Sequence, residues 1–239
     1  MNSHDQRHRN AHPDDQALFG DQQLLRLQKA VYELCWLFNH GYARHSAITL
    51  VGDHHQLGRR QRIAIGRAAC SDDRKNARNC KCLKLQQIKN RDLIIDGFNL
   101  IITLEAAIAG AVLLQCRDGC IRDLASVHGT YQQVQETELI IEMIGRTLAA
   151  FEPASVYWLF DKPVSNSGRL TQLVRTTAEA HGWNWRADLH DNPDRAISSS
   201  DKIAITSDSV ILDAAEHWLN LTVYMLDHDF YDIWLIDLS

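Results

Sequence analysis

Three short apolar runs in the second half of the chain each end in an aspartate, and this pattern limits the fold more than any other feature. The runs span residues 92–96, 155–161 and 202–208, and the aspartates are Asp96, Asp161 and Asp208. Short apolar runs that contain several β-branched residues are typical of buried parallel strands. Because parallel strands are covered on both faces, we expect an α/β protein.

The segments between these runs have the apolar spacing of helices. Apolar residues recur every three or four positions in 137–150, and 168–181 is also expected to be helical. Strands that alternate with helices predict a doubly wound, mostly parallel sheet. Ligands of such a sheet bind outside the carboxyl ends of its strands, where the strand order reverses. If the three strands are neighbours, their aspartates converge at that edge.

Three converging carboxylates have a definite chemistry. Their charges repel one another, so the cluster is unfavourable unless a cation neutralises it or protons are taken up. Oxygen ligands suit Mg²⁺ or Mn²⁺, which bind through a few carboxylates, water and a substrate phosphate. We therefore expect Asp96, Asp161 and Asp208 to be catalytic residues that bind Mg²⁺ or Mn²⁺ and promote phosphoryl displacement. A single aspartate would be a weaker signal, because Asp is common in turns and caps.

The two parts of the chain carry opposite charge. Residues 1–90 contain 15 Lys and Arg against 8 Asp and Glu, whereas residues 91–239 contain 10 against 22. A basic segment favours a nucleic-acid partner, because Lys and Arg displace counterions from phosphates. We expect a basic helical domain over 1–90, with a polar linker at 71–90, and an α/β domain over 91–239.

The basic part has helical periodicity over 22–38, followed by a shorter helix, a turn that contains Gly52 and a second, basic helix. This order predicts a small all-α domain with a helix-turn-helix layout. The candidate nucleic-acid contacts are Arg59, Arg60, Arg62 and Arg67. A helical bundle whose basic face is only solvated stays open as the alternative.

Targeting and redox features are few. The first 13 residues have no apolar core, and the longest apolar stretch, 100–114, contains Glu105 and is shorter than the roughly 20 residues of a bilayer span. We expect no membrane partner and a cytoplasmic location. The spacings of Cys80 with Cys82 and of Cys116 with Cys120 differ from those of zinc knuckles, so we expect reduced thiols.

The surroundings of the three aspartates resemble the PIN-like and NYN-type ribonucleases. Asp96-Gly97-Phe98-Asn99 is similar to their first acidic strand end, 159–161 to the second and 206–209 to the third. Nearly the whole chain more closely resembles an uncharacterised prokaryotic family that joins an N-terminal helical domain of unknown function to a PIN-like domain. The motifs of that likeness lie at 12–13, 51–53, 67–72, 95–99, 122–125, 161–169 and 206–209.

The resemblance implies a PIN-like fold in which Asp96, Asp161 and Asp208 bind metal and Asn99 orients a ligand or water. Asp213 is a candidate fourth metal ligand, with an exposed helix residue as the open alternative. Glu105 lies where a second acid of PIN-like enzymes falls, but its apolar helix leaves that role open. An insertion at 116–131 makes spacing an unsafe guide to the acids of this chain.

Two polar segments are candidates for substrate contact. Ser165, Asn166 and Arg169 follow the second acidic strand at a predicted helix N-terminus, where backbone N–H groups bind phosphate. An N-cap turn with a surface arginine is the open alternative. Arg122 and His128 lie in a glycine-containing loop that we expect to cover the site as a lid, with a structural histidine as the alternative. Ser207 and Ser209 flank Asp208 and are expected to contact substrate.

These features together predict a metal-dependent ribonuclease, an endonuclease that hydrolyses RNA phosphodiesters. Two other functions stay open: a non-catalytic nucleic-acid-binding protein on a PIN-like fold, and an enzyme that acts on a small phosphorylated substrate. The first is favoured because all three strand-end acids are present.

Overall fold

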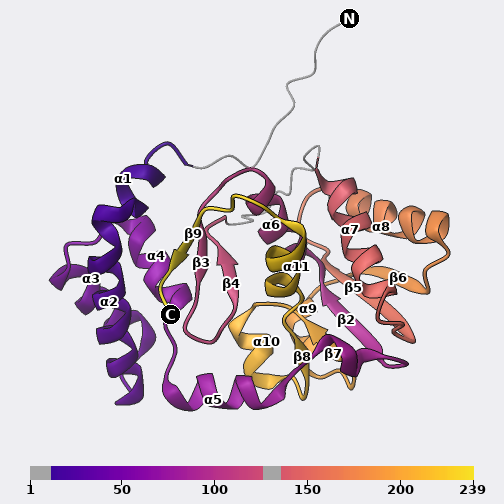
Figure 1. Cartoon of the computed structure of the whole chain (residues 1–239). Helices are drawn as coiled ribbons and strands as arrows, with labels where there is room; N and C mark the ends of the chain where they lie inside the picture. Colours follow the sequence, from indigo (N-terminus) through magenta and orange to yellow (C-terminus); the bar gives the residue numbers. More distant parts are fainter. Residues whose placement is uncertain (1–11, 126–135) are drawn as a thin grey trace, which may run out of the picture.

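The computed structural model describes residues 12–125 and 136–239, in the arrangement shown in Figure 1. Its helices are α1 (Asp15–Phe19), α2 (Asp21–Asn39), α3 (Arg44–His54), α4 (Arg59–Ala68), α5 (Asp72–Lys81), the 3₁₀ helix η1 (Leu85–Ile88), α6 (Gly97–Ile108), α7 (Thr137–Ala149), α8 (Ser167–His181), α9 (Pro193–Ser198), α10 (Ser209–Ala214) and α11 (Leu221–Asp229). Its strands are β1 (Cys82–Leu83), β2 (Asp92–Asp96), β3 (Leu113–Gln115), β4 (Ile121–Asp123), β5 (Ser155–Asp161), β6 (Trp185–His190), β7 (Ile203–Ile205), β8 (Trp218–Leu219) and β9 (Leu235–Asp237).

Six of these strands form one large sheet in the order β1-β8-β7-β2-β5-β6, and every pair in it is parallel. The prediction of a parallel α/β sheet is therefore confirmed. From the central strand β2 the chain runs outward through β5 to β6 and then returns to β7 and β8 on the other side. The strand order therefore reverses between β2 and β7, which is the place where open α/β sheets bind ligands.

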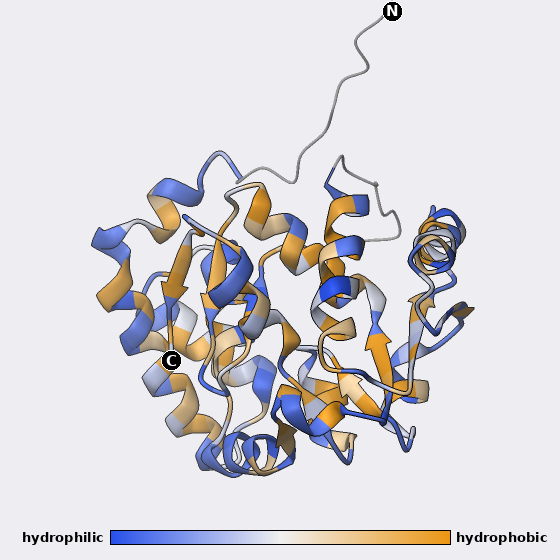
Figure 2. Ribbon diagram, turned by 45° about the vertical axis from the view of Figure 1, so that its right-hand side comes forward, coloured by the Kyte–Doolittle hydropathy of each residue, from blue (hydrophilic) through white to orange (hydrophobic). Residues whose placement is uncertain are grey.

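Helices cover both faces of the large sheet, as its continuous apolar strands require. Alternate residues of β2 point to opposite faces: Leu93 and Ile95 pack with α6, α7 and α8, whereas Ile94 packs with Ile197 of α9 and Ile211 of α10. Figure 2 shows the apolar residues concentrated along the central strands. The architecture is compatible with the doubly wound fold that the sequence predicts.

The N-terminal part, α1 to α4, is a helical bundle around residues such as Leu27, Leu34 and Ile65. The prediction that Gly52 lies in the turn of a helix-turn-helix is wrong. Gly52 lies inside α3, and the turn falls at residues 55–58. The helices approach closely here, since a Cβ on Gly52 would lie 2.7 Å from the guanidinium carbon of Arg62 on α4, whose side chain would have to move.

The segment 71–90, predicted to be a linker, is instead structured. Ser71 caps α5 by accepting a hydrogen bond from the backbone N–H of Arg74, and β1 forms the edge of the large sheet by pairing with β8. Arg78 of α5 is buried, and its carbonyl accepts a 2.7 Å hydrogen bond from Trp218 Nε1. The polar composition was misleading because α5 is held by charged contacts, whereas the linker prediction assumes that polar residues face water.

A small second sheet, in the order β4-β3-β9, lies between the helical bundle and the large sheet (Figure 1). Leu114 of β3 and Ile236 of β9 belong to the same apolar core as α2 and α4. The prediction that Arg122 lies in a loop is wrong, because Arg122 lies in β4 and is buried. His128 lies outside the described residues. Within 12–125 and 136–239, no helix has both the length and the apolar character to cross a membrane.

Candidate active site

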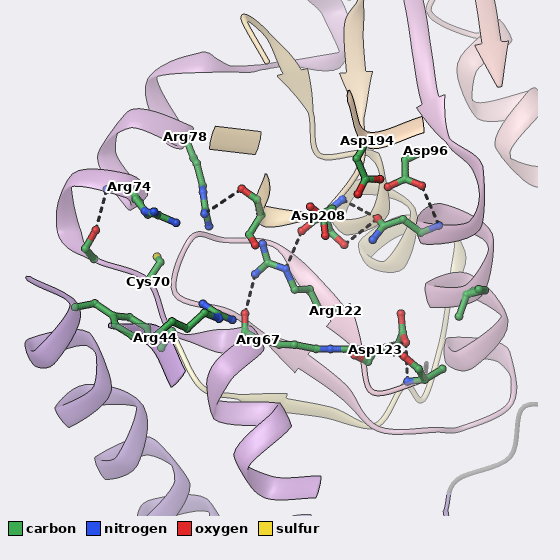
Figure 3. A pocket seen from close by; sticks show the side chains of 18 of the residues that line it. Arg44, Arg67, Cys70, Arg74, Arg78, Asp96, Arg122, Asp123, Asp194 and Asp208 are labelled. Atoms are coloured by element: carbon green, nitrogen blue, oxygen red, sulfur yellow. Dashed lines mark hydrogen bonds and ion pairs between the residues drawn. The ribbon is translucent and has the colours of Figure 1, made fainter. Parts of the chain in front are cut away.

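A cleft of about 650 Å³ opens between the helical bundle and the carboxyl edge of the large sheet. Four aspartates lie at the edge of the large sheet, and five arginines from α3, α4, α5 and β4 face them together with Asp123; Figure 3 shows most of these side chains. The aspartates at the strand ends and on α9 are Asp96, Asp161, Asp194 and Asp208, and the arginines are Arg44, Arg67, Arg74, Arg78 and Arg122. The three predicted aspartates therefore do line one cleft.

Strand order and helix capping place these aspartates. The strands β7, β2 and β5 are neighbours, and Asp96 pairs in register with Leu159, so that Asp161 lies two residues further along β5. Asp96 is the N-cap of α6. Asp208 is the N-cap of α10, where its Oδ1 accepts hydrogen bonds from the backbone N–H groups of Val210 at 2.7 Å and of Ile211 at 3.3 Å. The capping bonds hold these carboxylates in fixed orientations.

Hydrogen bonds join the end of β2 to the segment that follows β7. Thr206 Oγ1 donates to Asp96 Oδ2 at 2.9 Å, while Asn99 Oδ1 accepts from the backbone N–H and Oγ of Ser207 at 2.7 and 3.0 Å. Because a backbone N–H can only donate, the Asn99 side-chain atom that faces Ser207 is the amide oxygen. Its Nδ2 group has no hydrogen-bond partner in the described part of the chain, and Asn99 lines the cleft, so this amide is a free donor at the site.

Burial and mutual repulsion raise the pKa values of the cleft acids. Burial raises the pKa of Asp96 to about 7; the hydrogen bond from Thr206 opposes this shift, and the charges of Asp208 and Asp194 add to it. Burial also raises the pKa of Asp194, with Asp208 and Asp161 adding to the effect, and burial raises that of Asp161. In the absence of a cation, the buried Asp96 therefore retains a proton up to about neutral pH.

The donor set fits a hard divalent cation, because every candidate ligand is a carboxylate oxygen and the cluster is relieved by positive charge. In the described residues, no three of these aspartates have carboxylate oxygens that all lie within 4.8 Å of one another. This spacing suits Mg²⁺ or Mn²⁺, which keep several waters and bind some carboxylates through them. It does not suit a small dehydrated ion held by protein ligands alone.

Asp194 is the acid that the sequence reasoning missed. It lies in the first turn of α9, where Asn192 Oδ1 accepts from the N–H of Arg195 at 3.0 Å and Pro193 begins the helix. An Asn-Pro-Asp run is a typical helix start, so its aspartate resembles an ordinary dipole-favoured residue. The only available signal was its position directly after a strand, at the same sheet edge as the other acids.

Asp213, the predicted fourth metal ligand, lies outside the cleft lining. Its carboxylate pairs with Arg74 Nη1 at 2.9 Å and with Arg78 Nε at 2.7 Å. The structure thus gives Asp213 a contact between α10 and α5. Glu105 is buried in α6 and accepts a hydrogen bond from Thr137 Oγ1.

Two buried arginines share one buried aspartate beneath the cleft. Asp118 accepts from Arg122 at 2.9 and 2.7 Å and from Arg78 at 2.6 Å, and Arg122 Nε also donates to the Ser207 carbonyl at 2.8 Å. Burial alone would raise the pKa of Asp118, but the two guanidinium groups hold it below its ordinary value. Arg122, a predicted substrate contact, therefore also supports the loop that positions Ser207.

Arg44 differs from the other cleft arginines. Among the described residues, it alone of these five has no carboxylate partner. It donates to the Gly66 carbonyl and lies 5.8 Å from the ring centre of Phe38. Desolvation, together with the charges of neighbouring arginines, lowers its pKa. An exposed, oriented and unneutralised guanidinium is suited to bind an anion.

Some of the other predicted contacts line the cleft, and the rest lie outside it. Arg60 pairs with the buried Asp15, and Arg62 pairs with Asp53, whereas Arg59 is exposed and has no ion pair in the described chain. Ser207 and Ser209 line the cleft with Arg67, which pairs with Asp123 at 3.6 Å. Ser165, Asn166 and Arg169 lie at the start of α8, outside the cleft lining.

Comparison with known proteins places the chain in a two-part family. Residues 26–81 match a family described as protein of unknown function (DUF434), and residues 85–224 match one described as domain of unknown function (DUF5616). The uncharacterized protein MJ0935 of Methanocaldococcus jannaschii is 31% identical over 188 residues, which cover 79% of this chain and 89% of that protein. No solved structure matches the chain. Since the second match spans more than half of its length, the chain belongs to the DUF5616 family, with a DUF434 segment before it.

Proposed function

We propose that this protein is a metal-dependent ribonuclease that hydrolyses RNA phosphodiesters in the cleft between the helical bundle and the large sheet. The observation that carries the proposal is the composition of that cleft: four aspartates gather at the edge of the large sheet, and five arginines face them together with Asp123, the partner of Arg67. Phosphodiester hydrolysis needs both groups, because carboxylates hold the cation while guanidiniums bind the polyanion. The substrate class, RNA, comes from the resemblance of the three acidic strand ends to PIN-like and NYN-type ribonucleases.

In this proposal, Asp96, Asp161, Asp194 and Asp208 would hold Mg²⁺ or Mn²⁺, which supplies an activated water and neutralises charge when bound. The residues around them have separate tasks. Thr206 fixes the carboxylate of Asp96, and Ser207 fixes Asn99. The free Nδ2 of Asn99 donates to a non-bridging oxygen of the substrate phosphate. Both contacts are present before substrate binds, so little reorganisation is needed.

The substrate strand is positioned by the arginine side of the cleft. Arg44 binds a phosphate next to the one that is cleaved, because its guanidinium lines the cleft and has no carboxylate partner in the described residues. Arg78 and Arg122 act less directly, since both are buried against Asp118. In this arrangement RNA contacts the first turn of α3, which lines the cleft. The turn between α3 and α4, where a helix-turn-helix would contact nucleic acid, is not the main contact.

The direct test is cleavage of a pool of end-labelled single-stranded RNAs by the full chain. We expect cleavage with Mn²⁺ or Mg²⁺, loss of cleavage with EDTA and recovery when metal is restored in excess. Asp208→Asn should be inactive. The matched control is Asp201→Asn, which alters an exposed aspartate between α9 and β7, outside the cleft lining. RNA binding without cleavage would instead support a non-catalytic RNA-binding protein, and metal binding without RNA binding would support a small phosphorylated substrate.

A second prediction separates the cleft from the predicted helix-turn-helix surface. Arg44→Ala should weaken RNA binding by about tenfold, since one guanidinium–phosphate contact contributes about 1–3 kcal/mol. Arg59→Ala removes an equally charged and exposed residue outside this cleft, and should change binding less than twofold, or roughly 0.4 kcal/mol. Fluorescence anisotropy with labelled RNA at fixed salt measures both. The reverse order of effects would place the RNA on α4.

A further inference from the structure

A second cluster of metal-binding side chains lies in the helical bundle, apart from the cleft. It consists of Glu33 on α2, His54 at the end of α3 and His55 immediately after it. His54 is ten residues from Arg44 along α3, which corresponds to about 15 Å of helix. The cluster shares no residue with the cleft.

The backbone brings these three side chains together. His54 is the last residue of α3 and His55 is its C-cap, and their imidazole rings lie 4.8 Å apart, edge to face. His55 Nε2 lies 2.8 Å from Glu33 Oε2. One ligand atom from each residue lies within 4.8 Å of the other two, a set that the cleft aspartates do not form.

We infer that Glu33, His54 and His55 form a zinc-binding site that joins α2 to the turn between α3 and α4. Two imidazoles and one carboxylate are typical Zn²⁺ ligands, and three protein ligands leave a fourth position for water. Mg²⁺ is a poor competitor here, because it prefers oxygen ligands. The cluster and the cleft therefore select different metals by donor type.

The surroundings of the cluster favour a cation. Glu33 and His54 line a groove of about 320 Å³ whose other walls are Tyr32, Trp36, Leu37, Leu50 and Val51. No lysine or arginine is among these lining residues, so no neighbouring positive charge competes for the carboxylate. An apolar rim also strengthens the attraction between a bound cation and its ligands, because water screens it less.

The test is a zinc titration of the full chain by calorimetry, with excess Mg²⁺ present to occupy the cleft. His4 and His8 are replaced by glutamine throughout, so that imidazoles near the start of the sequence do not contribute. We expect one bound Zn²⁺, with affinity reduced at least about tenfold by His54→Gln and by His55→Gln. The matched control, His45→Gln, removes an exposed histidine of the same helix and should leave the affinity unchanged.

Substitution with Co²⁺ gives an independent measurement. We expect visible absorption bands of four-coordinate Co²⁺ in the parent protein and their loss in His54→Gln. Because His54 is exposed, the circular dichroism spectrum of this variant should show the same helix content as the parent. The inference would be overturned if the parent protein did not bind zinc. It would also be overturned if the His54 and His55 variants bound zinc as tightly as the parent. Because RNA cleavage is not measured, failure of the ribonuclease proposal would leave this result unaffected.

Discussion

Asp96→Asn is expected to abolish RNA cleavage while making the folded protein more stable above neutral pH. Loss of the carboxylate should reduce the cleavage rate by on the order of 10²–10³-fold, the size of effect seen when one charge-stabilising group is removed from an active site. The side chain is buried and its pKa is about 7, so the ionised group is unfavourable in the metal-free fold. A residue kept for folding would give the opposite change in stability.

The pH dependence of this variant has a definite sign. Between the ordinary value of 3.8 and about 7, the folded state keeps a proton on Asp96 that the unfolded chain loses, so wild-type stability falls as pH rises through this window. Asparagine has no such proton. Without metal, the variant should therefore gain on the order of 4 kcal/mol over the wild type at about pH 8, and little at about pH 4. Urea unfolding at both pH values measures this difference.

Cleavage activity should also depend on the ionisation of Asp96, but it should rise with pH where the stability of the metal-free fold falls. Only the ionised carboxylate attracts a cation, so cleavage and Mn²⁺ affinity of the wild type should both rise with pH through about 7. Calorimetric titration with Mn²⁺ at several pH values should also show proton release on binding. A variant that cleaves RNA normally, or that loses stability at high pH, would contradict the role given to Asp96.

Asp118→Asn is expected to lower the free energy of unfolding by about 3–5 kcal/mol, because it leaves the buried guanidiniums of Arg78 and Arg122 without their shared carboxylate. An asparagine amide would direct N–H donors at guanidinium N–H donors. Most single domains have a total stability of about 5–15 kcal/mol, so this loss is large. Chemical denaturation followed by circular dichroism measures it.

The matched control for this loss is Asp53→Asn. Asp53 pairs with Arg62 at 2.7 Å, but its side chain is 67% exposed, and exposed ion pairs contribute about 0–1 kcal/mol. Both aspartates pair with arginine but only Asp118 is buried, so the comparison separates the effect of burial on stability from the effect of losing a charge. Equal effects of the two substitutions would show that the network beneath the cleft adds no more than a surface pair.

The acidic strand ends could be predicted because β2, β5 and β7 are short, apolar and buried, and each is followed by its aspartate. Their convergence depends on strand order, which the sequence suggested only by the rule that ligands bind at the sheet edge. Asp194 could not be found in this way. Its carboxylate reaches the cleft from α9, through packing of that helix against β2 and β5 that no local pattern encodes.

The arginine side of the cleft shows why a charge run is a poor guide to contacts. The basic residues from Arg59 onward have the composition of a nucleic-acid surface, yet Arg60 and Arg78 pair with aspartates of distant segments, and Arg62 pairs with the nearby Asp53. The partners lie up to 135 residues away along the chain, so sequence neighbours give no sign of them. Strand β9 could not be predicted for the same reason, because its three residues pair with β3, which lies far away in the sequence.

That late strand ties the order of synthesis to folding. Ile236 and Leu238 fill the apolar core of the N-terminal helices, and Gln28 of α2 donates a 3.0 Å hydrogen bond to the carbonyl of Asp237. Chains fold as they leave the ribosome, beginning with the N-terminal part. Here the first helices emerge early but have an incomplete core until residues 235–238 follow. During translation the apolar faces of these helices therefore stay uncovered until residues 235–238 have been synthesised.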